Sequence, residues 1–368
     1  MDIVDGVDGG WGIVRSSRVT ERKFMPEIDA ILQADIDDRV INGAAIFSGT
    51  VDDDVFSLCV GHAENTRQVP MRLDTVIDVA SVTKAAAGVT ALLICHSRGL
   101  IDFDAPFTEY LPDFQAKLFR PITVRELANH TSGFGDVPGQ KQRLYFDESG
   151  AQMLRNMLVT PPPRPPTVHA DYACWNYILL AMILERCTGS SFPDFCEKEI
   201  FQPLSMTDSR LGQPPPTVGS DRLAQTMGTD APGQISDFVA ARIYRDGGST
   251  ANAGLFTTAL DLAKLLRCYL RHGAVPGQPR LFSEASFAEA APDRQSQVDG
   301  YRRLGWVIWD QRLHEDAFGS VLLHSGWSGQ TILMHLPRQF FAIVLTTRCG
   351  DYERAKRNRF AIIERLLR

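Results

Sequence analysis

No stretch of this 368-residue sequence is long and apolar enough to form a transmembrane helix. A helix that spans a bilayer needs about 20 consecutive, mostly apolar residues. The first residues, "MDIVDGVDGG", are acidic, and no apolar segment with a cleavage site follows them, so the pattern of a secretory signal is absent. We therefore expect a cytoplasmic protein with no membrane partner.

The chain also lacks an excess of positive charge and the motifs of several enzyme classes. Its 38 Lys and Arg are outnumbered by 44 Asp and Glu, which leaves no basic footprint for nucleic acid. The seven cysteines are odd in number and never spaced C-x-x-C, a pattern that favours reduced thiols over a disulfide framework or a zinc site. A Walker loop, H-E-x-x-H and G-x-S-x-G are missing. We expect no metal and no organic cofactor, and a small molecule as the partner.

The apolar pattern that is present changes twice along the chain. Residues 25–41 have helical spacing and residues 43–63 alternate as two strands, whereas helical signals dominate from Ser81 to about Cys268. Strand patterns then return and an amphipathic helix closes the chain. This order predicts an α/β domain built from residues 1–75 and 250–368, with an all-α domain of residues 76–249 inserted and an active site in the cleft between them.

A serine and a lysine lie three residues apart at the start of the first strongly helical segment, in "ASVTKAAAG". Positions i and i+3 share a helix face, so Ser81 and Lys84 can form a hydrogen bond. A buried lysine loses hydration, its pKa falls, and it can relay the serine proton during nucleophilic catalysis. For an isolated pair the simpler interpretation is that Ser81 caps the helix while Lys84 extends to solvent.

Two further motifs follow this S-x-x-K in a fixed order. They are "HADYACWNY" at residues 169–177 and "LLHSGWSGQT" at residues 322–331. With "PITVRELANHTSGF" and "LGWVIW", this order resembles the serine β-lactamase and DD-peptidase superfamily, in the branch of class C β-lactamases and esterases, whose motifs are S-x-x-K, Y-x-N and K-T-G or H-x-G. The resemblance implies an antiparallel sheet from both chain ends, flanked by helices, and a serine enzyme that forms an acyl intermediate.

The resemblance also implies a role for each matching residue. Ser81 would be the nucleophile, Lys84 its amine partner, and Tyr172 the general base. The H-x-G strand would line the cleft opposite Ser81, and the backbone N–H groups of Ser81 and Trp327 would form the oxyanion hole. A side chain at the glycine of this strand would block a substrate lying against it. The strand residues are His324, Ser325 and Gly326. His130 and Asp261 are expected to be structural and not parts of a triad.

The sequence departs from the family pattern at Cys174, which stands where Y-x-N has asparagine. A thiol is a weak hydrogen-bonding group, so it replaces an amide side chain in substrate binding poorly, unless Asn176 compensates. We expect carboxylic esters or activated acyl groups as substrates of a serine hydrolase or acyltransferase. The alternatives are an amidase or D-aminopeptidase, a weak β-lactamase, and a catalytically silent binding protein of the same fold.

Overall fold

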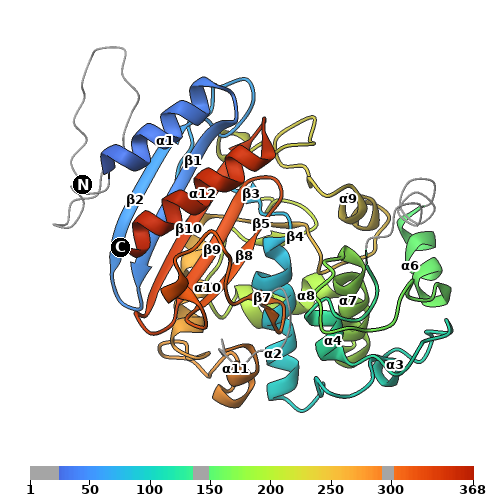
Figure 1. Ribbon diagram of the computed structural model, residues 1–368. Helices are drawn as coiled ribbons and strands as arrows, with labels where there is room; N and C mark the ends of the chain where they lie inside the picture. The colour runs from blue at the N-terminus through green and yellow to red at the C-terminus, as the bar shows by residue number, and fades with distance from the viewer. Residues whose placement is uncertain (1–24, 136–148, 292–301) are drawn as a thin grey trace.

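The computed structural model describes residues 25–135, 149–291 and 302–368, and its central layer is an antiparallel seven-stranded sheet (Figure 1). The strand order is β2-β1-β10-β9-β8-β7-β6. Strand β1 pairs with β10, with Ile46 opposite Val344, so strands from the early and late parts of the chain lie side by side in one sheet. The strands are β1 (Ile41–Thr50), β2 (Asp54–Gly61), β6 (Arg302–Arg303), β7 (Trp306–Val307), β8 (Val321–Ser325), β9 (Gln330–His335) and β10 (Phe340–Arg348).

Both faces of the central strands are buried because helices cover each side of the sheet. Alternation sends Ile343 of β10 toward the larger apolar core and its neighbour Val344 toward a smaller one. Helices α1 (Met25–Asp37) and α12 (Tyr352–Leu367) cover the smaller core, and Ile28 of α1 and Ile363 of α12 belong to it. The larger core continues from the sheet into the central helices, so the sheet and these helices share one apolar core.

Most of the helical residues lie between β2 and β6 in the sequence, and α4, α6, α7 and α9 gather beside the sheet (Figure 1). The helical segment after Ser81 is a π-helix, η1, that continues as α2. These elements are η1 (Lys84–Val89), α2 (Thr90–Ser97), α3 (Phe107–Tyr110), α4 (Val124–Ala128), α6 (Gly150–Val159), α7 (Cys174–Thr188), α8 (Phe192–Cys196), η2 (Glu197–Phe201), η3 (Ser220–Arg222), α9 (Phe238–Arg245), α10 (Ala259–Leu270), α11 (Glu284–Ala290) and, after β7, η4 (Glu315–Ala317).

The predicted fold class is confirmed, with differences in individual elements. Helix α7 ends at Thr188, and the residue that follows, Gly189, has a φ of 67°, which suits glycine. Among the segments where strand patterns return toward the end of the chain, "GWVIWDQRL" (residues 305–313) forms a strand only at the two residues of β7. A second, small sheet of β3 (Ile77–Asp78), β5 (Leu255–Thr257) and β4 (Arg210–Leu211) lies directly before Ser81. The division into domains at residues 75 and 249 stays a prediction.

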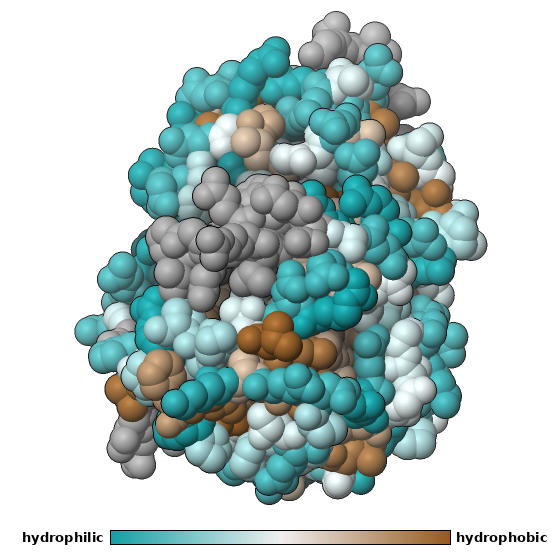
Figure 2. Space-filling model, turned by 90° about the vertical axis from the view of Figure 1, so that its right-hand side faces the viewer, coloured by the Kyte–Doolittle hydropathy of each residue, from teal (hydrophilic) through white to brown (hydrophobic). Residues whose placement is uncertain are grey.

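The surface in Figure 2 is mostly hydrophilic, with hydrophobic residues in small separate groups. Within residues 25–135, 149–291 and 302–368, no helix has the length and apolar character needed to cross a membrane. All seven cysteines carry free thiols.

Candidate active site

The chain makes a turn just before Ser81, at a residue with unusual backbone geometry. Ala80 has a φ of 47°, a left-handed conformation that is uncommon for alanine. The turn is held by Asp78, which accepts the Ala80 N–H at 3.2 Å, and by Thr83, whose hydroxyl donates to the Ala80 carbonyl at 2.6 Å. The same Thr83 oxygen accepts the N–H of Leu255 from β5 at 3.1 Å. Ser81 is thus presented on a turn that is fixed on both sides.

Lys84 is fully buried, so the interpretation that its amine extends to solvent is wrong. Its Nζ donates to Ser81 Oγ at 3.1 Å, to the Asn252 carbonyl at 2.8 Å and to Cys174 Sγ at 3.7 Å. Three acceptors match the three protons of an ammonium group. Burial lowers the pKa of Lys84, but the negative forms of Cys174 and Tyr172 raise it, and the net direction is upward. The expected fall in the pKa of this lysine is therefore wrong, and the geometry fits a resting ammonium.

Tyr172 lies at the open side of this group, with 36% of its surface exposed. Lys84 Nζ is 4.9 Å from the centroid of its ring, and the guanidinium carbon of Arg302 is 5.3 Å from the same point. The ring of His130 is 4.6 Å away. The phenol is thus close to the Ser81–Lys84 pair and accessible to a substrate. Arg302 was missed by the sequence analysis, because its neighbours in the sequence contain no motif that points to Tyr172.

Cys174, and not Asn176, faces Lys84. Cys174 is the first residue of α7, and its sulfur is directed at the buried amine. Asn176, two residues further along α7, is buried, and there its side-chain oxygen accepts from Ser132 Oγ at 2.6 Å and its amide nitrogen is 3.1 Å from His130 Nδ1. The amide of Asn176 is therefore engaged elsewhere and does not compensate for the thiol.

The two residues that resemble parts of a triad are separate and have structural partners. His130 Nδ1 accepts the N–H of Ala173 at 3.2 Å, and burial holds the pKa of this imidazole well below its usual value. Asp261 accepts the N–H of Asp208 and the hydroxyl of Ser209, both at 2.9 Å. These contacts tie loops to helices and leave no Ser-His-Asp arrangement around Ser81.

Strand β8 brings the H-x-G motif beside the Ser81 turn. Burial, followed by the charges of Arg302 and Lys84, holds the pKa of His324 well below its usual value, so its imidazole is neutral. Ser325 Oγ is 3.0 Å from Thr331 Oγ1 of β9. A Cβ on Gly326 would lie 2.6 Å from the Val79 carbonyl oxygen. The glycine is thus needed because the backbone before Ser81 packs against it, a reason different from the expected space for substrate.

Two backbone N–H groups near the Ser81 turn and the H-x-G motif have no protein acceptor among the residues that the structure describes. They are those of Ser81 and Trp327, the pair expected to form the oxyanion hole. The Trp327 carbonyl accepts from Arg348 Nε at 2.9 Å, and the Arg348 guanidinium lies over the indole ring at 5.1 Å. Arg348 therefore steadies the Trp327–Ser328 peptide group, next to the Gly326–Trp327 peptide that carries the Trp327 N–H, and the shared role of the two N–H groups stays a prediction.

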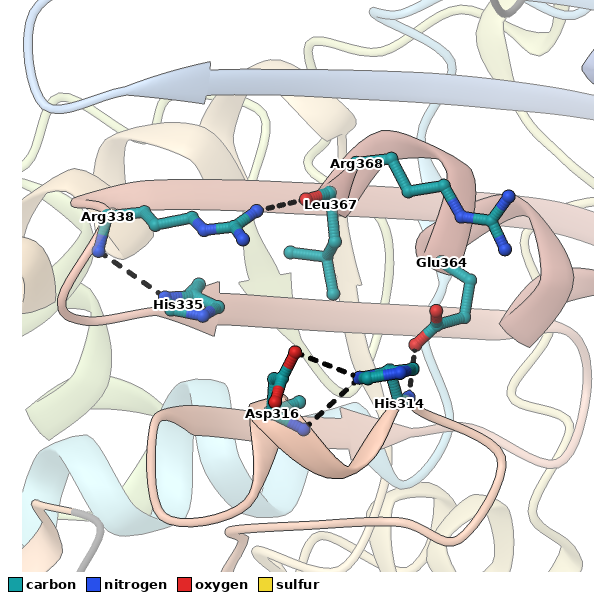
Figure 3. A pocket seen from close by; sticks show the side chains of 8 residues that line it. His314, Asp316, His335, Arg338, Glu364, Leu367 and Arg368 are labelled. Carbon is teal, nitrogen blue, oxygen red and sulfur yellow. Dashed lines mark hydrogen bonds and ion pairs between the residues drawn. The ribbon is translucent and has the colours of Figure 1, made fainter.

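A separate hollow of about 390 Å³ lies at the C-terminal end of α12 (Figure 3). The His314 N–H donates to Glu364 Oε1 at 2.6 Å, and the Asp316 N–H donates to His314 Nδ1 at 3.3 Å. None of the candidate catalytic residues lines this hollow. In the described part of the chain, no cluster of three or more His, Cys, Asp or Glu is arranged to hold a metal ion.

The sheet, the fixed turn at Ser81 and the order of motifs define the class of protein: the chain belongs to the Beta-lactamase family, whose model matches residues 28–367. The resemblance inferred from the sequence is thereby confirmed. The family match covers nearly all of the described chain, including each of the three motifs.

The chain is similar to proteins with different activities. It is 26% identical to esterase EstB of Burkholderia gladioli over 82% of this chain and 84% of that protein. It is 27% identical to penicillin-binding protein 4* of Bacillus subtilis over 45% of this chain, and that match spans only 38% of the relative. Its fold is similar to that of EstCE1, described as a hydrolase with promiscuous acyltransferase activity, with a TM-score of 0.72, 17% identity, and coverage of 93% of this chain and 98% of that one.

Proposed function

We propose that this protein is a serine hydrolase or acyltransferase that forms an acyl-enzyme on Ser81, with carboxylic esters or activated acyl groups as substrates. The observation that carries the proposal is the buried Lys84 amine, which donates a hydrogen bond to Ser81 Oγ and lies 4.9 Å from the ring centroid of Tyr172. Burying a charged amine without a compensating role is costly. A protein that only binds ligands has no need of it.

The proposed reaction uses Tyr172 as the base and Lys84 as a fixed cation. The Tyr172 phenolate takes the proton of Ser81 Oγ as the oxygen bonds to the acyl carbon. The carbonyl oxygen becomes negative between the N–H groups of Ser81 and Trp327. The bond to the leaving alcohol then breaks, and that alcohol takes the proton from Tyr172. Water or an acceptor alcohol repeats these steps in reverse, which releases the acyl group and restores Ser81.

The preference for esters rests on Cys174. A substrate with an amide side chain needs a strong donor or acceptor beside Lys84, and a thiol offers only a weak one. A simple acyl group has no such requirement. The names of esterase EstB and of EstCE1 agree with this preference, and they support it only as similarity.

The test is intact-mass spectrometry after exposure to a fluorophosphonate and to a panel of acyl esters. We expect one adduct per chain, on the peptide that contains Ser81, and no adduct on a folded Ser81→Ala variant. Ser97→Ala, at the far end of α2, serves as the control and should retain the adduct. An adduct that persists in Ser81→Ala, or one that maps to Cys174, would contradict the proposal. Rates on matched ester and amide pairs then separate an esterase from an amidase.

A further inference from the structure

Tyr172 lies between two cations from distant parts of the chain. Lys84 of η1 and Arg302 of β6 approach its ring centroid to 4.9 and 5.3 Å. The lysine form of the third motif, K-T-G, would place a further cation on β8, but this chain has the uncharged imidazole of His324 there. We infer that Arg302 is a positioning residue for the base: its guanidinium stabilises negative charge on Tyr172 and replaces the cation that His324 does not supply. This inference rests on the proposed function.

Arg302 is held in place by the turn that follows its strand. Its Nη1 donates to the Gly305 carbonyl oxygen at 3.1 Å, which closes the short turn between β6 and β7. Burial lowers the pKa of Arg302, and the negative forms of Tyr172 and Tyr177 raise it. A guanidinium has so high an ordinary pKa that it stays charged in proteins. A cation within about 6 Å of an aromatic ring is attracted to it, so the contact with Tyr172 is favourable before any proton moves.

The other titratable groups around Tyr172 do not supply this charge. His130 and His324 are buried, and burial holds the pKa of each imidazole well below its usual value. The carboxylate of Asp171, next in sequence to Tyr172, is paired with Arg164 at 3.0 Å. The remaining groups that face the phenol or its lysine partner are Cys174 and Tyr177 of α7 and Asp237, the residue that caps α9, whose carboxylate is 4.0 Å from Cys174 Sγ. All of these are neutral or negative.

The size of the effect follows from distance and exposure. The Arg302 guanidinium carbon is 5.3 Å from the ring centroid of Tyr172, close enough for its charge to favour the phenolate, and the 36% exposure of Tyr172 screens part of that interaction. We expect Arg302→Gln to move the acidic limb of the pH profile of kcat/KM upward by about one pH unit. At pH values below the midpoint of that limb, Arg302→Gln should turn over a p-nitrophenyl ester about 10-fold more slowly than the wild type, while the plateau at high pH should change much less.

Three further variants separate charge from packing. Arg302→Lys keeps the positive charge, so its limb should remain near that of the wild type. Arg303→Gln is the matched control, because Arg303 Nε donates to the Glu289 carbonyl at 3.1 Å, away from Tyr172. Adding His324→Lys to Arg302→Gln should move the limb back toward the wild-type position. A folded Arg302→Gln with an unchanged limb, or an equal shift in Arg303→Gln, would overturn the inference.

A spectroscopic titration keeps this inference distinct from the proposed function. The near-ultraviolet absorbance of phenolate, taken as wild type minus Tyr172→Phe, reports the ionisation of Tyr172 without any turnover. Arg302→Gln should shift this titration upward by about the same pH unit as the kinetic limb. If the wild type is never acylated on Ser81, the proposed function fails. If acylation occurs and neither titration moves, only the role of Arg302 fails.

Discussion

Replacing Cys174 by asparagine tests whether this position sets the preference between amide-bearing and simple ester substrates. Cys174 is the first residue of α7, and its Sγ is 3.7 Å from Lys84 Nζ. An asparagine there offers an oxygen acceptor to the ammonium and two N–H donors to a substrate. Asn176 leaves this role open, because its amide is already bonded to Ser132 and lies beside His130.

The expected magnitude follows from the group that the thiol leaves unpaired. A buried polar group without a partner costs roughly 1 to 3 kcal/mol, which is about one to two decades in rate if it is felt in the transition state. A short-chain ester has no amide and avoids this cost. Cys174→Asn should therefore raise kcat/KM for nitrocefin relative to that for a p-nitrophenyl ester by about 10-fold or more. The ester rate itself should barely change.

The assay is the ratio of the two efficiencies in both proteins, measured alongside their melting temperatures. Cys187→Asn is the matched control, since Cys187 is a half-buried thiol near the other end of the same helix. That control should leave the ratio unchanged. An unchanged or reduced ratio in a well-folded Cys174→Asn would refute the reasoning. It would show that the thiol is a packing residue and that ester preference has another origin.

Three other outcomes are expected. Tyr172→Phe and Lys84→Ala should each lower ester turnover by at least about 100-fold, and their effects should not add in the double variant, because the Lys84 cation acts by stabilising the negative charge of the Tyr172 base; additive losses would assign them separate tasks. Burial raises the pKa of Asp78 to about 6 from an ordinary value of 3.8, so the folded state favours the neutral carboxylic acid. The stability that this group contributes is therefore complete below the ordinary pKa of 3.8 and is lost as the pH rises through the folded-state pKa of about 6. Chemical denaturation from about pH 4 to 8 should show a decline in the free energy of unfolding of up to about 3 kcal/mol that Asp78→Asn lacks; equal slopes would contradict this. Gly326→Ala should lower the melting temperature and ester turnover together, since its Cβ meets the Val79 carbonyl at 2.6 Å, and a variant with wild-type values of both would disprove that contact.

Local sequence patterns determined much of the fold. The helical spacing of apolar residues in α1 and α12 and the short apolar runs of β1 and β10 each depend on neighbours a few residues apart, so they are readable along the chain. The proximity of Ser81 to Lys84 is also local, because an i, i+3 pair shares one face of a helical turn. The remaining motifs could be placed at one site only through their order and the family resemblance.

Only the tertiary structure decided the electrostatics around that pair. The carbonyl of Asn252, the sulfur of Cys174 and the ring of Tyr172 reach Lys84 from three distant segments, and together they favour the ammonium that burial alone would disfavour. Arg302, on the edge strand β6, is 130 residues from Tyr172 in the sequence and reaches its ring only in the folded chain. A side chain's charge state depends on every group within a few ångströms, whatever their separation in sequence. The spacing of apolar residues along the chain does not show which distant segments will supply those groups.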